Sequence, residues 1–431
     1  METKLVRIAE ISAISKHPIF TSVYHLINED MLKQCHKELD GSKAVGIDKV
    51  TKDEYGKNLD RNIKDLVQRL KNKSFKPLPS LRVYIPKANG KKRPLGIASY
   101  EDKIVQMAVK KILGTIYEPR FLNCMYGFRP NRGCHEAIKE VYQRISYGKI
   151  SYIVDADIKG FFDHIDHDWM MKFLEWNIQD KNLLWLIRKY LKAGIMEQGK
   201  FEPTEEGSAQ GSVMSPMLAN IYMHHVLTLW FKLVVKKKMQ GECFLVNFAD
   251  DFVAGFQYKS EAERYYKGLK ERMEKFGLEL ESSKSRLIEF GRFAEQNRRA
   301  RGECKPETFD FLGLTFYCGR SRKGMPYIMP KTSSKKFRQK IRDIKVWLYA
   351  NRDQPLKKLM GMLNLKLIGH YRYYGISFNG RMISNYKQQV RELLFKVLNR
   401  RSDRKSYTRE GFIEMLKYYP LAMPKIYVSL F

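Results

Sequence analysis

Two adjacent carboxylates stand between two apolar runs in the segment NFADDFVAGF, residues 247–256. The flanking runs have the composition of short buried strands, and a polar pair between them is typical of a hairpin turn. Asp250 and Asp251 are therefore predicted at the tip of a hairpin whose strands lie in a core. The two carboxylates would then be held on a rigid scaffold rather than in a loose loop.

The carboxylate pair has three interpretations. It can be a solvated turn, because aspartate is a common turn residue. It can be an acid–base dyad, in which one carboxylate raises the pKa of the other. It can also be part of a divalent-metal site, where a cation cancels the repulsion between the two charges.

A second apolar segment, KISYIVDADI at residues 149–158, favours the metal site. This segment is predicted to be a strand that ends in Asp155 and Asp157. Beside the hairpin, it would bring Asp157 next to Asp250 and Asp251. Three carboxylates there can bracket two Mg²⁺ ions about 4 Å apart, an arrangement used for phosphoryl transfer.

The net charge indicates a polyanionic partner. The 431 residues include 79 Lys and Arg against 47 Asp and Glu, a formal net charge of +32. Nucleic acid is the first expectation and an anionic membrane the second. The longest apolar stretch, which starts at Met217, is interrupted by His224, His225 and Lys232, so it is predicted to be a buried helix rather than a membrane span. A basic chain with a carboxylate metal site is expected to act on nucleic acid. The candidate functions are therefore those of polymerases and nucleases.

Cysteines and the N-terminus bear on location. The six cysteines are scattered without a CxxC pair, which argues against a zinc module and a disulfide framework. The first residues lack the apolar core of a secretion signal. We therefore expect a reducing compartment, the cytoplasm.

The rest of the sequence predicts where helices and strands lie and sets a basic C-terminal segment apart. Residues 21–75 are predicted to be helical, 79–86 a strand, 101–118 a helix and 244–256 a strand, a turn and a strand. From residue 331 to 410 there are 21 Lys or Arg against 5 Asp or Glu. Apolar residues recur there at helical spacing, which predicts amphipathic helices with basic outer faces; they are Phe337, Ile341, Ile344, Leu348, Leu356, Leu359, Leu363, Leu367, Val390, Leu393 and Val397.

At this level of detail the chain resembles the reverse transcriptases encoded by group II introns. The resemblance rests on motifs in the family's order: RVYIPKANGKKRPLGIASYEDKIVQ, YGFRPNRGCHEA, DADIKGFFDHIDHD, GSAQGSVMSPMLANIY, FADD and ETFDFLGLTFYCG. KLIGHYRYYGIS and LFKVLNRRSDRKSYTREGFIEMLKYYPL resemble the family's maturase region. The family resemblance as a whole covers the chain from about residue 30 onward.

The resemblance implies an α+β right-hand polymerase with fingers, palm and an α-helical thumb or maturase domain. The expected divisions are an N-terminal extension and the start of the fingers over residues 1–75, fingers and palm over 76–320, and the thumb over 321–431. Relatives often carry a C-terminal DNA endonuclease domain. We expect none here, because the chain ends at Phe431 and lacks paired cysteines.

The resemblance also implies roles at the active site. Asp157, Asp250 and Asp251 would be the catalytic residues and the ligands of two Mg²⁺ ions, and Asp155 a structural neighbour. Phe162 would lie under the sugar and exclude a 2′-hydroxyl. The other dNTP-binding residues would be Lys87, Arg93, Gln210, Gly211 and Lys284.

Contacts to RNA and primer are expected from basic side chains outside the active site, namely Arg129, Lys335, Lys336, Arg338, Arg400 and Arg401. The expected partners are an RNA template, structured intron RNA, a DNA primer or target, and dNTPs, with no membrane. The implied function is RNA-directed DNA synthesis with assistance to intron splicing and mobility. Two alternatives stay open: a stand-alone reverse transcriptase recruited to a role such as bacterial defence, and an RNA-binding splicing factor with an idle polymerase.

Overall fold

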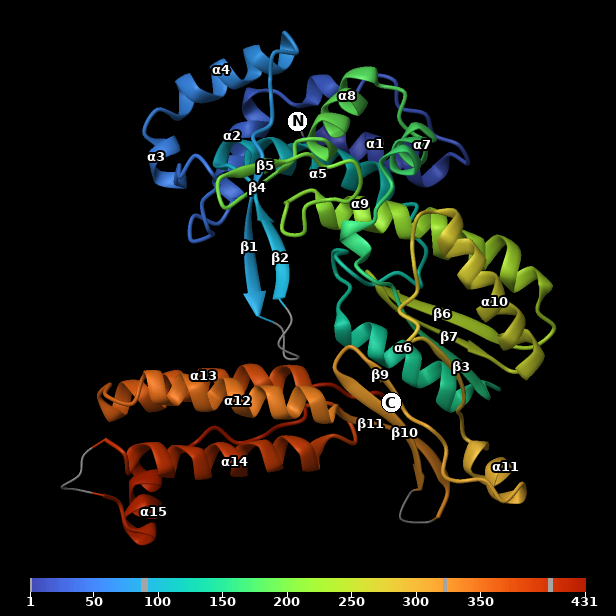
Figure 1. The fold of residues 1–431 in the computed structure, drawn as a ribbon, viewed down its shortest axis with the longest axis vertical. Helices are drawn as coiled ribbons and strands as arrows, with labels where there is room; N and C mark the ends of the chain where they lie inside the picture. Colours follow the sequence, from blue (N-terminus) through green and yellow to red (C-terminus); the bar gives the residue numbers. More distant parts are fainter. Residues whose placement is uncertain (1, 87–91, 321–323, 402–405) are drawn as a thin grey trace.

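The computed structural model describes residues 2–86, 92–320, 324–401 and 406–431, which form a mixed helix and sheet fold (Figure 1). The helices are α1 Glu2–Ile14, α2 Glu29–Glu38, α3 Lys52–Gly56, α4 Leu59–Lys71, α5 Tyr100–Tyr117, α6 Cys134–Tyr147, α7 His167–Glu175, α8 Lys181–Leu191, α9 Ser215–Met223, α10 Lys259–Lys275, α11 Ala294–Ala300, α12 Ser334–Ala350, α13 Leu356–Tyr374, α14 Gly380–Leu398 and α15 Arg409–Tyr418. The strands are β1 Ser80–Pro86, β2 Lys92–Ile97, β3 Tyr152–Asp157, β4 Ile195–Glu197, β5 Lys200–Glu202, β6 Cys243–Phe248, β7 Asp251–Phe256, β8 Arg286–Glu289, β9 Phe309–Phe311, β10 Leu314–Arg320 and β11 Pro326–Thr332.

The central sheet has the strand order β6-β7-β3-β8, and all neighbouring strands are antiparallel. Side chains alternate between the two faces of a strand, and both faces are covered. Val154 and Phe252 belong to the same core as Leu269 of α10, whereas Ile153 and Val253 pack in a second core with Val141 of α6. The predicted hairpin and the predicted strand beside it are therefore confirmed.

A second sheet, with the order β2-β1-β4-β5, links the N-terminal helices to the centre of the molecule. Its β1–β2 hairpin extends away from these helices toward α12 and α13 (Figure 1). The predicted strand over 79–86 and helix over 101–118 correspond to β1 and α5. Helix α5 begins where the Ser99 side chain accepts a hydrogen bond from the Asp102 amide, a typical N-cap.

The apolar stretch beyond Met217 lies in a continuous helical segment, Ser215–Lys238. By length and composition it is the one helix in the described part of the chain that can cross a membrane. However, 67% of its most apolar window is buried inside the protein. This burial agrees with the predicted core helix.

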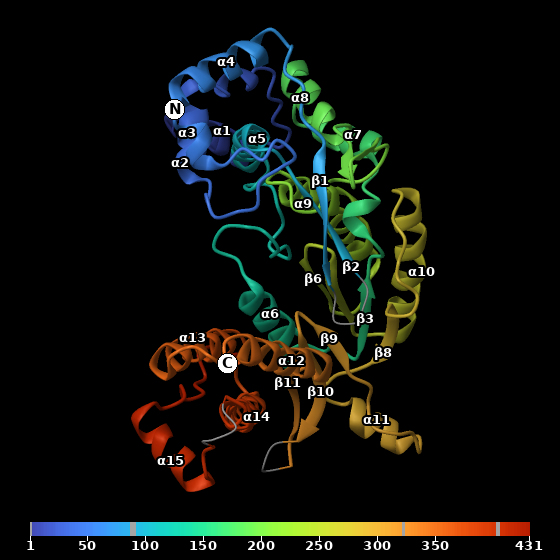
Figure 2. The same ribbon diagram turned by 60° about the vertical axis from the view of Figure 1, so that its left-hand side comes forward.

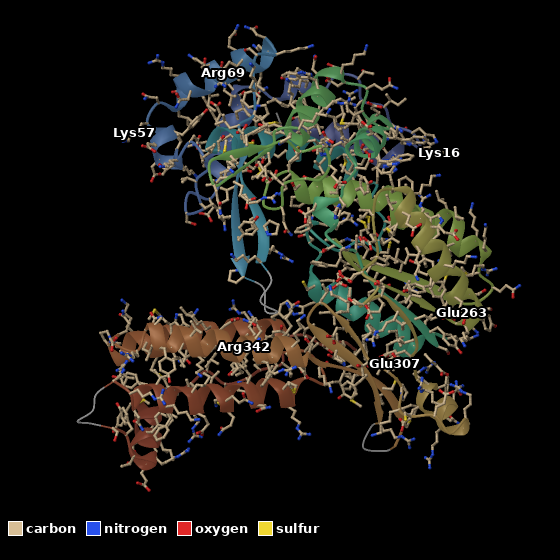
Figure 3. All side chains as sticks on the ribbon, viewed as in Figure 1. Lys16, Lys57, Arg69, Glu263, Glu307 and Arg342 are labelled. Atoms are coloured by element: carbon tan, nitrogen blue, oxygen red, sulfur yellow. The ribbon has the colours of Figure 1, made fainter. Side chains whose placement is uncertain are left out.

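The C-terminal helices α12–α15 lie at the opposite end of the molecule from α1–α4 (Figure 2). Most of the periodic apolar residues, including Phe337, Leu363 and Val390, are buried between these helices, as predicted. Ile341, Leu356 and Leu393 of the same pattern are only partly buried. The outer faces carry many nitrogen-tipped side chains, among them the exposed Arg342 (Figure 3).

Candidate active site

The turn between β6 and β7 presents the carboxylate pair. Ala249 adopts a left-handed conformation with φ of 57°, which turns the chain sharply before Asp250. The buried Asn247 side chain donates a 2.7 Å hydrogen bond to the Ala249 carbonyl and so holds this conformation. The apolar strand pattern did not single out Asn247, although an asparagine that bonds two residues ahead is a known turn signal.

Strand β3 brings the third carboxylate to this turn. Asp157 lies directly opposite Asp251 in the antiparallel pairing of β3 with β7. Residues directly opposite in such a pair project from the same face, so these carboxylates are neighbours. The structure therefore brings together Asp157, Asp250 and Asp251 as the sequence predicted.

Burial and mutual repulsion perturb this carboxylate group. Burial raises the pKa of Asp251 to about 8, with the charges of Asp155, Asp250 and Asp157 adding to the shift. The Leu312 amide donates a 3.4 Å hydrogen bond to Asp251 and partly opposes it. Burial also raises the pKa of Asp250, as does the Asp157 charge. Such a group binds a positive charge favourably, because a cation relieves both penalties.

Three basic side chains lie close to the carboxylates. The Lys284 ammonium contacts the Asp157 carboxylate directly. Arg93 of β2 is close enough that its charge opposes the raised pKa of Asp250. Arg286 lies 3.9 Å from Asp155, whose pKa is raised to about 7 mainly by burial.

The donor set fits a divalent cation in its chemistry. Carboxylate oxygens are the ligands that Mg²⁺ prefers, and the nearby basic charges of Arg93 and Lys284 only partly offset the raised pKa of Asp250. Within residues 2–86, 92–320, 324–401 and 406–431, no group of three or more His, Cys, Asp or Glu side chains is already arranged around a metal position. The Lys284 ammonium at Asp157 occupies the place of a cation.

Three of the predicted nucleotide-binding residues belong to two segments that are bonded to each other, the one after β3 and the loop before α9. The chain after β3 places Phe161 in the core, whereas Phe162 is only partly buried against it. The Phe162 carbonyl accepts a 2.7 Å hydrogen bond from the Ser208 amide, which ties it to the loop that carries Gln210 and Gly211. Lys87 lies outside the described residues.

Gly211 allows the loop to approach β2 closely. Its φ is 111°, and an added Cβ would lie 3.0 Å from the Gly96 carbonyl oxygen. The Gly96 amide in turn donates a 2.7 Å hydrogen bond to the Gln210 carbonyl. The loop and the β1–β2 hairpin are therefore held together as one unit.

Arg129 does not have the exposed position that an RNA contact requires. Only 9% of the residue is exposed, and its guanidinium lies 2.8 Å from the Glu118 carboxylate and bonds the carbonyls of Leu122 and Met125. Met125 in turn forms a β-bridge with Asn247. Arg129 thus braces the loop that packs on the catalytic turn, and the predicted RNA contact is corrected to this structural role.

The other predicted RNA-binding residues differ in their surroundings. Lys335, Lys336 and Arg338 are exposed at the start of α12. Arg400 is also exposed, but it donates a 2.7 Å hydrogen bond to the Tyr349 hydroxyl. Arg401 is partly buried and donates a 2.8 Å hydrogen bond to the Gln354 carbonyl.

Comparisons with known proteins agree with this arrangement. Residues 85–316, more than half of the chain, match the family model of the reverse transcriptase (RNA-dependent DNA polymerase), and residues 334–413 match the group II intron, maturase-specific domain. The chain is similar to the group II intron-encoded protein LtrA of Lactococcus lactis subsp. cremoris, with 37% identity over 238 residues, 55% of this chain and 39% of that protein.

Two further relatives give the same picture. Protein YkfC of Escherichia coli is 37% identical over 187 residues, 43% of this chain and 49% of the relative. The uncharacterized 91 kDa protein in the cob intron of Schizosaccharomyces pombe is 37% identical over 204 residues, 47% of this chain and 25% of the relative. The matched segments thus span between a quarter and a half of these three relatives.

Proposed function

Because the chain belongs to the reverse transcriptase (RNA-dependent DNA polymerase) family and carries a group II intron maturase-specific domain, we propose that it copies RNA into DNA. The observation that carries this proposal is the register that sets Asp157 opposite Asp251, beside Asp250. Asp157 ends β3, Asp251 begins β7 and Asp250 lies in the turn before β7, at a site that favours a positive charge.

The proposed reaction is attack of a primer 3′-hydroxyl on the α-phosphate of a dNTP, with pyrophosphate as the leaving group. Asp157, Asp250 and Asp251 would hold two Mg²⁺ ions, which activate the hydroxyl and neutralise the triphosphate when bound. Lys284 lies within contact of Asp157 and would neutralise the leaving pyrophosphate. Lys87 and Arg93 would grip the triphosphate, since lysine acts as a point charge and arginine as a fork.

Nucleotide selection would come from the loops around Phe162. Its ring is only partly buried, so part of it is available to a substrate. A ring under the sugar excludes a 2′-hydroxyl by steric clash. Gln210 and Gly211 would support the nucleotide, because their backbone is held against Gly96.

The arrangement of the elements supports the right-hand polymerase description. The central sheet would be the palm, the β1–β2 hairpin and the helices around it the fingers, and α12–α14 the thumb (Figure 1). Template and primer would lie between them, above the carboxylate edge.

A second proposed function is binding of structured intron RNA to assist splicing and mobility. The specific observation in its favour is the maturase-specific match over residues 334–413, which coincides with the basic C-terminal helices. Exposed Lys335, Lys336 and Arg338 can contact RNA backbone phosphates without reading sequence. We place this protein in the cytoplasm, bound to RNA.

Primer extension tests the polymerase proposal. The full chain is incubated with a DNA primer annealed to an RNA template, dNTPs and Mg²⁺, and we expect extension to the end of the template. No extension under these conditions, with RNA binding intact, would overturn the polymerase and leave the splicing role alone. Group II intron RNA domains in the DNA that flanks the gene would identify the RNA partner.

A further inference from the structure

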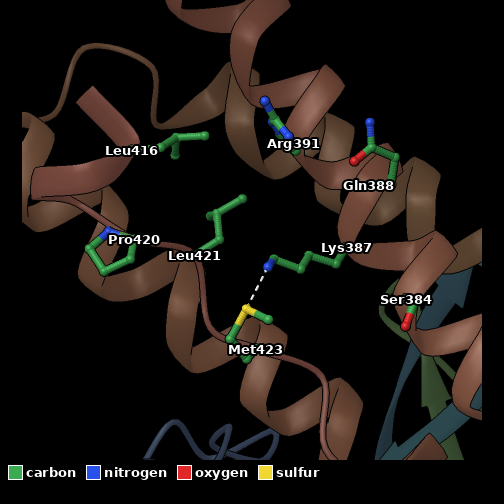
Figure 4. A pocket seen from close by; sticks show the side chains of 8 residues that line it. All are labelled: Ser384, Lys387, Gln388, Arg391, Leu416, Pro420, Leu421 and Met423. Atoms are coloured by element: carbon green, nitrogen blue, oxygen red, sulfur yellow. Dashed lines mark hydrogen bonds between the residues drawn. The ribbon is translucent and has the colours of Figure 1, made fainter. Parts of the chain in front are cut away.

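A small pocket lies between α14 on one side and the end of α15 with the segment that follows it on the other. It encloses about 240 Å³ and is lined by Ser384, Lys387, Gln388, Arg391, Leu416, Pro420, Leu421 and Met423. Pockets that hold drug-sized ligands enclose about 300–1,000 Å³, so this one has room for a smaller group. The four polar residues come from α14 and form one wall, and the four apolar residues form the wall that faces it (Figure 4).

The polar wall carries two cations that have no anionic partner among the residues that the structure describes. Lys387 and Arg391 are four residues apart on α14 and so share one helix face. The Lys387 ammonium lies 2.7 Å from the Met423 sulfur, a weak acceptor (Figure 4). Arg391 has no hydrogen bond or ion pair within the described part of the chain.

The carboxylates nearest in sequence are already engaged. Glu392 lies 3.2 Å from the Arg409 guanidinium, and Glu414 lies 2.5 Å from the Lys417 ammonium. The pocket therefore presents positive charge that its own surroundings do not neutralise. An anionic ligand group would find two charge-assisted donors there.

The opposite wall offers apolar surface of an adaptable kind. Leu421 is buried and gives this wall a fixed base, whereas 71% of Met423 is exposed. Methionine is flexible and polarizable, so it adjusts to a flat ring laid against it. Leu416 and Pro420 complete the apolar side (Figure 4).

We propose that this pocket binds one unpaired nucleotide of a structured RNA. The phosphate binds Lys387 and Arg391, and the base lies against Leu416, Leu421 and Met423. A nucleotide joins a negative group to a flat ring, which matches the two walls, and only an unstacked base leaves its faces free for such contact. This inference rests on the proposed RNA-binding function and adds a place where the protein senses an extruded base.

The test uses the full chain and three fluorescein-labelled RNA hairpins. One hairpin carries a single bulged uridine, the second has an abasic residue at the bulge, and the third is fully paired. Burial of the base against the apolar wall should make the bulged hairpin bind about fivefold more tightly than the abasic one, or better. Replacing the bulged base with 4-thiouridine should give a photo-crosslink to the peptide that contains Leu416–Met423.

Two kinds of variant test the contributions of the apolar and polar walls separately. Ser384→Trp fills the pocket from its rim and Met423→Glu places a carboxylate beside Lys387, so each should abolish the preference for the bulged base. Lys387→Gln and Arg391→Gln should each lower the log–log salt slope of binding by about 0.7–0.9. Lys396→Gln, on the same helix but outside the pocket lining, is the matched control and should keep the bulge preference and the crosslink.

Equal binding of the bulged and abasic hairpins by the parent, or an unchanged preference in folded Ser384→Trp and Met423→Glu, would overturn the nucleotide pocket. A lowered salt slope without a bulge preference would mean that phosphate alone binds, which also overturns it. Both results leave the proposed function standing if the parent still binds RNA and extends primers. A parent that binds none of the hairpins and extends no primer would instead refute the proposed function.

Discussion

The edge of the central sheet that carries Asp157, Asp250 and Asp251, here called the carboxylate edge, holds negative charge, whereas the outer faces of α12–α15 hold positive charge. The two regions also differ in how closely their charges are spaced. At the first, Asp157 ends β3 opposite Asp251 at the start of β7, and Asp250 lies in the turn just before β7. At the second, Lys335, Lys336, Arg338 and many other cations are exposed and spread along helices. Close, buried charges depend on one another, whereas exposed charges act nearly independently through water. Single substitutions should therefore switch the first region off and only weaken the second.

The largest effect is expected at the carboxylate edge. Asp157→Asn or Asp250→Asn removes one charge from the proposed metal ligands and should abolish cDNA synthesis in primer extension. The basic helices are unchanged, so RNA affinity should stay within about twofold, the range of independent sites. Continued cDNA synthesis by Asp250→Asn would show that the carboxylate edge, like the basic helices, tolerates the loss of a single charge.

Arg129 provides a buried cation to compare with the exposed ones. Arg129→Met leaves the Glu118 carboxylate without its partner, and breaking a buried ion pair costs about 3–5 kcal/mol of unfolding free energy. Arg338→Met, at an exposed position, should cost less than about 0.5 kcal/mol. Urea denaturation measures both. Similar costs for the two variants would remove the distinction between bracing and surface arginines.

Phe162 tests whether the site selects deoxyribonucleotides. Phe162→Val should raise rNTP incorporation relative to dNTP by about tenfold or more, which corresponds to about 1.4 kcal/mol of discrimination. The measurement is primer extension on RNA with each nucleotide type, beside a thermal melt. The buried Phe161 is the matched control, because Phe161→Val should lower stability and all activity together. A folded Phe162→Val enzyme that still rejects rNTPs would place the sugar pocket elsewhere.

The sequence predicted the parts of the molecule that follow from local pattern. The hairpin with Asp250 and Asp251 at its tip and the strand that ends at Asp157 were readable from apolar runs interrupted by carboxylates. The family resemblance supplied the order of the motifs. Whether a long basic side chain is buried or exposed was not readable, because Arg129 and Arg338 are the same residue type. Arg129 is held by Glu118 and by the carbonyls of loop residues, whereas Arg338 donates to the Ser334 carbonyl of its own helix.

The same reason explains two further omissions. Asn247 lies within a predicted strand, where its buried bond to the Ala249 carbonyl depends on the exact turn. The pocket beside Lys387 forms from α14 and a segment about 30 residues later, and no local pattern brings the two together. Contacts between distant segments are therefore what the structure adds.

The start of α12 tests the exposed region directly. Changing Lys335, Lys336 and Arg338 to glutamine should lower the log–log salt slope of RNA binding by about 0.7–0.9 for each phosphate that is no longer neutralised, or about 2.1–2.7 in all. Primer extension at saturating template should stay near the parent rate, since the carboxylates are untouched. An unchanged slope would mean that these side chains only solvate the helix.

The smallest effect is expected from Arg400→Gln together with Arg401→Gln. By sequence these two residues belong with the α12 cations, but in the structure each already has a partner within the protein. Arg400 donates to the Tyr349 hydroxyl and lies over its ring, and Arg401 donates to the Gln354 carbonyl.

A guanidinium that already holds a partner has fewer donors for phosphate, so the slope should fall by less than the roughly 1.4 expected when two phosphates are no longer neutralised. A urea denaturation of the same variant should instead show a loss of about 1 kcal/mol from the broken hydrogen bonds. A fall of about 1.4 in the salt slope with no change in unfolding free energy would contradict this prediction. Arg400 and Arg401 would then bind phosphate as the exposed α12 cations do, and their partners within the protein would make no difference.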